Sequence, residues 1–195
     1  MKALIRAGTL FALAAMLTVA WALQKGPGTE AHGPSQSAAD VLRDLANADG
    51  AFMAAGLVKD SFQADNLATM LQYPEDEIVV LGLKGSQIKQ AFERSVSLYP
   101  QPNTSFLQIS GFEVVFDPSA DPNQRIKRVT AGGSPLDDGK TYNVAMPASL
   151  GRGGLGYFKI WEKKMIVQTL ANVTMEKALS GKKAGDSAPR WKIER

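Results

Sequence analysis

The stretch from Ser149 to Trp161, "SLGRGGLGYFKIW", holds the densest set of residues that could do chemistry. Its glycines and Arg152 suggest a phosphate loop, but it lacks the Gly-Lys-Ser/Thr ending that places a lysine on a nucleotide phosphate. It also lacks the acidic ribose ligand and ordinary βα unit of a dinucleotide-binding fingerprint. Two other interpretations stay open. The stretch is either a tight turn, or a platform on which Tyr157 and a second ring stack a base for about 1 to 3 kcal/mol each.

Composition limits other kinds of catalytic centre. The chain has no cysteine and a single histidine, His32, which lies in a stretch rich in Gly and Pro. Sulfur-based metal sites, histidine-rich metal centres and triads with a histidine base are therefore excluded. Glu75, Asp76 and Glu77 are adjacent carboxylates, but neighbours in an extended segment point apart and cannot flank one bond. We interpret them as a solvated charge run.

The charge balance gives no indication of nucleic-acid binding. The formal charge is +3 and the pI is about 9.1. Without Lys2 and Arg6 of the leader, 20 Lys and Arg residues face 19 Asp and Glu residues, a net charge of +1. Nucleic-acid binding needs a clustered basic face. With 195 residues, 45% of them hydrophobic, the chain can bury one core, so we expect one domain.

Residues 1–22 predict a signal peptide. Lys2 and Arg6 begin it, an apolar run follows, and Ala20-Trp21-Ala22 fits the A-x-A cleavage pattern. The alternative is an uncleaved anchor, although the run is short for a spanning helix of about 20 residues. We therefore expect export to a periplasm or the exterior, with membrane attachment if the leader is uncleaved.

The segment after the leader predicts a flexible linker over residues 23–37. It is composed of Gly, Pro and polar residues without periodicity, and His32 inside it is expected to be solvated. The folded domain is expected over residues 38–195.

The remaining pattern mixes helix-like and strand-like segments, which predicts an α+β fold with mixed β-sheets and packed helices. Residues 78–83, "IVVLGL", form a continuous apolar run typical of a covered strand. Gly111 indicates a bend within the strand-like run 106–116. The expected helices lie at residues 38–46, 66–71, 86–99 and 165–179, and the further strands at 126–130, 142–146 and the terminal "RWKIER".

An ordered set of segments resembles the C-terminal domain of the 5′-nucleotidase / UDP-sugar hydrolase family. The segments are "LKGSQIKQAFERSV" at 83–96, "FLQISGFEVVFDPS" at 106–119, "TYNVAMPASLGRGGLGYF" at 141–158 and, more weakly, "ADGAFMAAGLVK" at 48–59. The resemblance implies a nucleotide pocket in which two aromatic rings sandwich the base. It also implies that catalysis belongs to a separate N-terminal metallophosphoesterase domain with two metals, which this sequence does not show.

The resemblance implies a ligand site over six positions. Phe106 and Tyr157 match the two stacking rings, and Gln108 matches a polar residue that contacts the base. Glu162 matches an acidic residue for ribose, and Lys59 replaces an arginine for phosphate, without the bidentate fork of the guanidinium. Arg152 could approach an anion.

The loops around this site depart from the family pattern. Asn-Gly-Gly has become Ala54-Ala55-Gly56, "GGDG" has become "GGLG" with Leu155, and "PFGN" has become "QYPEDE". Ring positions are kept better than positions that face phosphate and metal.

Three functions follow. The leading hypothesis is an exported module that binds a nucleoside, nucleotide or nucleotide-sugar without hydrolysing it. The second is the substrate-binding half of a split 5′-nucleotidase, completed by a separate metallophosphoesterase chain. The third is a structural or interaction protein that has lost the ligand. We expect no cofactor in this chain itself, with divalent metals only if such a partner supplies their site.

Overall fold

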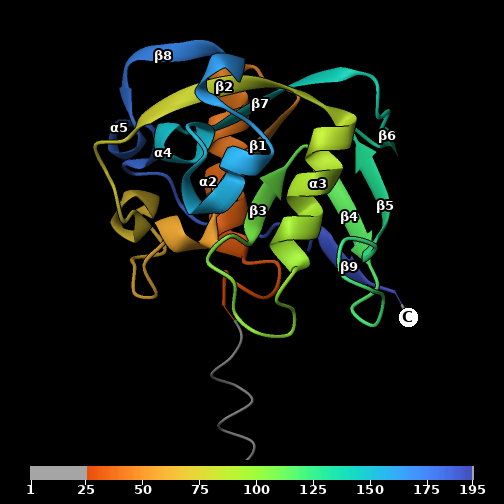
Figure 1. The fold of residues 1–195 in the computed structure, drawn as a ribbon. Coiled ribbons are helices and arrows are strands. Elements are labelled where there is room, and N and C mark those ends of the chain that lie inside the picture. Colours follow the sequence, from red (N-terminus) through yellow and green to blue (C-terminus); the bar gives the residue numbers. More distant parts are fainter. Residues whose placement is uncertain (1–25, 195) are drawn as a thin grey trace, which may run out of the picture.

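The computed structural model describes residues 26–194, which form one α+β domain (Figure 1). The expected fold class is confirmed. The helices are α2 (Gly33–Ala46), α3 (Gly85–Val96), α4 (Ala148–Gly151) and α5 (Met175–Leu179), with 3₁₀ turns η1 (Ala55–Leu57), η2 (Leu67–Met70), η3 (Gly154–Lys159) and η4 (Lys163–Met165). The strands are β1 (Gly50–Ala54), β2 (Glu77–Lys84), β3 (Leu107–Ser110), β4 (Phe112–Phe116), β5 (Ile126–Ala131), β6 (Ser134–Pro135), β7 (Thr141–Pro147), β8 (Ile166–Thr174) and β9 (Trp191–Ile193).

The larger sheet has five strands in the order β3-β1-β7-β2-β8. Strand β1 runs parallel to β7, with Ala51 opposite Ala145, and the other neighbours are antiparallel. Helix α2 packs against β1, β3 and β7, while α4 contacts β2 and β7. Because helices cover its central strands, the apolar run in β2 is buried, as the sequence predicts.

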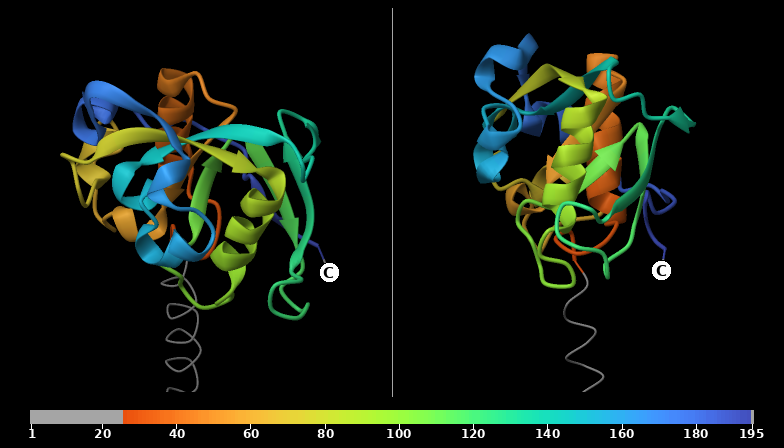
Figure 2. Two further views of the ribbon diagram at one scale, coloured as in Figure 1. Left: turned by 45° about the horizontal axis from the view of Figure 1, so that its top comes forward. Right: turned by 45° about the vertical axis from the view of Figure 1, so that its right-hand side comes forward.

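The smaller sheet has four strands in the order β6-β5-β4-β9, with β9 parallel to β4. Figure 2 shows it beside α3. Buried aromatic rings join it to the larger sheet: Phe112 of β4 lies 5.8 Å from Phe52 and 5.9 Å from Phe92, between ring centroids. Gly111, with φ of +78°, makes the predicted bend between β3 and β4, where a side chain would collide with the Asp49 carbonyl.

One predicted helix is largely wrong. Residues 166–174 form strand β8 on the edge of the larger sheet, and only Met175–Leu179 are helical. Val167, Thr169 and Val173 are β-branched residues that favour a strand, and β8 finds its partner in β2. The helical periodicity could not reveal this pairing, because strand β2 is almost 90 residues earlier in the chain.

The linker prediction is also wrong where the structure describes it. Helix α2 begins at Gly33, with Pro34 in its first turn, and Ser35, Gln36 and Ser37 are buried. Proline is well placed there because its missing N–H would have no helical partner. The leader, residues 1–22, and residues 23–25 lie outside the described part. Within residues 26–194, none of the helices has the length and apolar character needed to cross a membrane.

Candidate functional site

Four loops meet at one end of the five-stranded sheet, which we call the loop end. Strands β1 and β7 are parallel, so the loops that follow them lie at the same end. The loops that precede the antiparallel strands β2 and β3 lie there too. Side chains connect them, since Leu155 and Thr104 both lie close to Gly56. The loop end therefore gathers residues 55–60, 72–76, 102–106 and 148–159.

The glycine-rich loop is held by hydrogen bonds from α3 and from the loop before β3. The Leu155 carbonyl accepts from the Arg94 guanidinium, at 3.1 Å from Nε, and from the Ser105 hydroxyl at 2.8 Å. Gly153, Leu155 and Gly156 all have positive φ, so the chain turns sharply here. Both glycines permit this geometry without strain. The loop is a tight turn, one of the two interpretations that its sequence leaves open.

Tyr157 faces inward and is fully buried. Its ring stacks on Trp161 at 4.4 Å between centroids and 7° between planes, and its hydroxyl donates to the Ser105 carbonyl. Burial raises the pKa of Tyr157 far above its ordinary value, although the hydrogen bond with Ser95 and the charge of Arg94 oppose this. Tyr157 therefore stays neutral and acts as a buried hydrogen-bond donor.

Phe106 is also a core residue, with 1% of its surface exposed. Its ring packs on Trp191 at 4.8 Å between centroids. Because Phe106 and Tyr157 are each buried against a different tryptophan, the structure does not present them as two faces of an open pocket. The predicted base sandwich is wrong in this structure. Phe106 lies directly before the buried strand β3, and the glycine-rich loop turns Tyr157 inward, so both rings lie in the core.

Gln108 is fully buried, and its amide holds the segment before α2. The side-chain nitrogen donates to the carbonyls of Pro27 and Glu30, both at 2.8 Å, and the side-chain oxygen accepts from the His32 backbone N–H at 2.9 Å. We call residues 26–32 the strap. The polar groups of Gln108 are thus used within the protein, which leaves none to contact a base.

Two further predicted site residues form exposed ion pairs. Arg152 pairs with Glu77 at 2.9 Å, which connects the glycine-rich loop with the start of β2. Glu162 pairs with Lys164 at 3.0 Å, two residues away along the chain. Exposed pairs of this kind contribute little to stability. Neither residue lines the cavity at the loop end.

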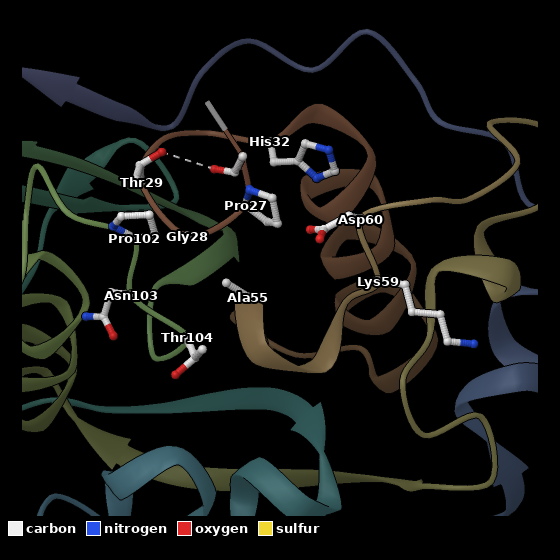
Figure 3. Close-up of a pocket in the computed structure, with 11 residues that line it drawn as sticks. Pro27, Gly28, Thr29, His32, Ala55, Lys59, Asp60, Pro102, Asn103 and Thr104 are labelled. Carbon is white, nitrogen blue, oxygen red and sulfur yellow. Dashed lines mark hydrogen bonds between the residues drawn. The ribbon is translucent and has the colours of Figure 1, made fainter. Parts of the chain in front are cut away.

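A cavity of about 540 Å³ lies between the strap, the loop after β1 and the loop before β3 (Figure 3). Lys59 is the sixth predicted site residue and lines this cavity. Figure 3 shows the Asp60 carboxylate directed toward the interior, and the Lys59 ammonium directed away from it. Neither charge makes an ion pair within residues 26–194. Thr104 is an exposed residue on the opposite wall.

Sequence reasoning did not find Asp60, Thr104 or the strap. Asp60 directly follows Lys59 in the sequence, and this adjacency to a predicted site residue is the one local feature that could have indicated it. The strap could not be found, because its position depends on Gln108, which lies 76 residues from His32. Across residues 26–194, no group of three or more histidine and acidic side chains is arranged to hold a metal ion.

His32 is half-buried in the cavity wall rather than solvated as expected. Its Nδ1 lies 2.8 Å from the Ser35 hydroxyl, and its ring meets Phe62 edge-on at 5.9 Å. Burial lowers the pKa of His32 below its ordinary value of 6.5. The folded protein therefore prefers the neutral ring.

We expect acid to weaken folding through His32. The unfolded chain binds this proton more readily, so the contribution is fully present above pH 6.5 and is lost as the pH falls through 6.5 toward the lower folded pKa. Urea unfolding at pH 7.5 and pH 5.5 should show a smaller loss of stability for His32→Gln than for the wild type. An identical loss in both proteins would contradict this assignment.

The family model and the curated relatives indicate the same family. The family model described as "5'-nucleotidase, C-terminal domain" matches residues 29–162. The chain is similar to 5'-nucleotidase of Bos taurus, at 35% identity over 109 residues, covering 52% of this chain and 19% of the relative. It is similar to snake venom 5'-nucleotidase of Naja atra, at 37% identity over 89 residues, covering 42% and 17%.

A solved structure shows the same fold. The 5'-nucleotidase precursor of Thermus thermophilus superimposes with a TM-score of 0.73 and 21% identity, over 94% of this chain and 43% of that chain. This chain thus spans less than half of that structure and about a fifth of the Bos taurus relative. Because the family model covers more than half of the sequence, the chain belongs to the 5'-nucleotidase C-terminal domain family.

Proposed function

We propose that this chain binds a nucleoside, nucleotide or nucleotide-sugar at the loop end and does not hydrolyse it alone. The observation that carries the proposal is the cavity of about 540 Å³ lined by Lys59 and Asp60. Its size lies within the range of small-molecule sites. The ligand class is taken from the names of the relatives, which are 5'-nucleotidases.

The lining suits the parts of a nucleoside. The Asp60 carboxylate can accept hydrogen bonds from two ribose hydroxyls, and such charge-assisted bonds are the stronger kind. Lys59 stands at the rim on a flexible stem, so its ammonium can follow a phosphate that projects outward. The pyrrolidine rings of Pro27 and Pro102 and the imidazole of His32 line the cavity and supply ring surface against which a base can pack.

Ligand binding is tested by thermal unfolding with adenosine, AMP and UDP-glucose. A ligand at 100 times its Kd should stabilise the protein by about 2.7 kcal/mol. Asp60→Asn should weaken adenosine binding about tenfold, since one charge-assisted hydrogen bond contributes about 1.5 to 3 kcal/mol. Lys59→Gln should weaken the binding of AMP but leave the binding of adenosine nearly unchanged.

Matched controls come from the same surface. Asp65→Asn removes an exposed carboxylate on the loop after Asp60, and Lys163→Gln removes an exposed ammonium outside the cavity. Both should bind like the wild type. The proposal fails if none of the three compounds raises the melting temperature, or if purified protein with added divalent metal hydrolyses AMP.

A second candidate is the substrate-binding half of a split enzyme. Its supporting observation is a pair of exposed aromatic residues on loops at the loop end: Tyr73 is 58% exposed and Phe158 is 62% exposed. Aromatic residues of this kind are common anchors of protein interfaces. The partner would be a separate metallophosphoesterase chain, which would supply the divalent metals. AMP hydrolysis should then appear only in the mixture, and Tyr73→Ala with Phe158→Ala should lower it.

We also propose that the chain is exported, on the basis of residues 1–22. Mass spectrometry of the mature protein should find its first residue at Leu23. A mature chain that retains Met1 and sediments with membranes would favour the uncleaved anchor instead. If neither ligand nor partner binds, the domain is a structural or interaction protein that has kept the fold without the ligand.

A further inference from the structure

A second cavity, of about 570 Å³, lies on the other side of the glycine-rich loop. Helix α3 forms its floor through Lys89, Gln90, Glu93 and Arg94, which occupy two i, i+4 pairs on one face of the helix. The turn before β5 and the end of η3 form its walls. None of these lining residues belongs to the cavity of the proposed function.

The charges around this cavity do not cancel. The carboxylate of Glu93 accepts from the backbone N–H groups of Arg125 and Ile126, at 3.1 and 2.8 Å. Lys89 pairs with Asp138 at 2.7 Å. Arg94 and Lys159 lack such a partner, since no carboxylate within residues 26–194 forms an ion pair with either. The cavity therefore carries an excess of positive charge.

Arg94 is held in place by neutral groups. Its Nε and Nη2 donate to the Leu155 carbonyl, Nη2 also donates to the Ser105 hydroxyl, and the guanidinium carbon lies 5.3 Å from the centre of the Tyr157 ring. A side chain at Gly156 would collide with this guanidinium. The Nη1 group makes no hydrogen bond in the described structure. A fixed guanidinium with one free edge is a good donor to an oxyanion, because its geometry needs no reordering on binding.

The geometry points to a second binding site, for a small oxyanion, between α3 and η3. Arg94 provides the fixed donor, and Lys159 provides a mobile positive charge at the rim. Gln90 on the floor and Asn123 on the wall provide neutral polar side chains. The shared chemistry is that of a phosphate monoester or a carboxylate. This site stands apart from the proposed nucleoside site, because its residues and its cavity are different.

Titration of the full chain with inorganic phosphate at constant ionic strength, followed by amide NMR, tests the site. We expect shifts at Gln90, Asn123 and Lys159. Lys159→Gln should weaken phosphate binding at least fivefold. Gln90→Glu changes an exposed residue and adds a negative charge to the floor of the cavity, so it should weaken phosphate binding at least tenfold. The same titration with acetate distinguishes a phosphate site from a carboxylate site, because stronger binding of acetate than of phosphate would assign the site to carboxylates.

Two control variants separate a built site from general charge. Lys163→Gln removes an exposed lysine that does not line the cavity, and Gln168→Glu adds a charge on β8. Both should bind phosphate within twofold of the wild type. The proposal is overturned if Lys163→Gln weakens phosphate as much as Lys159→Gln, or if neither anion shifts the amides of the cavity. Adenosine binding at Asp60 should be unchanged in Lys159→Gln, so the experiment tests the oxyanion site independently of the nucleoside site.

Discussion

Tyr157→Ala is expected to destabilise the fold by about 3 to 5 kcal/mol, the usual cost of removing a large buried aromatic ring. The ring is fully buried and stacked on Trp161. The substitution also removes the hydrogen bond that the tyrosine hydroxyl donates to the Ser105 carbonyl. Urea unfolding followed by circular dichroism measures the change.

Two further variants show whether Tyr157 is structural. Tyr157→Phe keeps the stack but leaves the Ser105 carbonyl without its donor, so a smaller loss of about 1 to 3 kcal/mol is expected. Phe158→Ala changes the exposed neighbour and should alter stability by about 0.5 kcal/mol or less. If Tyr157→Ala were as stable as the wild type and lost only ligand binding, Tyr157 would be an open stacking platform after all.

Gln108→Leu is expected to release the strap and to destabilise the protein by about 3 kcal/mol, since each buried polar group left without a partner costs about 1 to 3 kcal/mol. Three backbone groups lose their partner together: the carbonyls of Pro27 and Glu30 and the N–H of His32. Leucine has nearly the same size, so the packing loss is small. Solvent reaches the freed strap, which limits the total cost.

Hydrogen exchange identifies this release directly. The His32 amide should lose protection in Gln108→Leu, while amides in α3 keep theirs. The control Gln168→Leu changes an exposed glutamine of β8 and should leave the strap protected. Because the strap lines the cavity, AMP binding should weaken in Gln108→Leu as well. Unchanged protection of His32 would show that Gln108 does not hold the strap.

Local sequence patterns predicted much of the fold. The apolar run of β2, the amphipathic α3, the bend at Gly111 and the last strand follow from spacing that nearby residues determine. The edge strand β8 does not follow from local spacing, because its structure depends on pairing with β2. Gly33 and Pro34 are residue types common in linkers, so the local pattern does not indicate that α2 starts there, although proline is favourable in a first turn.

The candidate site was harder to predict, because matching a ring to a family position does not give the direction of the ring. Phe106 and Tyr157 are aromatic residues at plausible positions, and both point into the core. Positive φ at Leu155 and Gly156 turns the loop, and no local pattern reveals this. Lys59 is a predicted site residue and does line the cavity. Asp60, the next residue, lines it too, but the cavity depends on the position of the strap, which the sequence does not predict.

The most direct test of the nucleoside site is an amide NMR titration of the full chain with AMP. The cavity predicts shifts that saturate at Thr29, Lys59, Asp60 and Thr104, and that require about tenfold more AMP in Asp60→Asn. Amides of β9, on the smaller sheet, should stay unchanged. Saturating shifts confined to other parts of the surface, or no saturating shifts at all, would contradict the account.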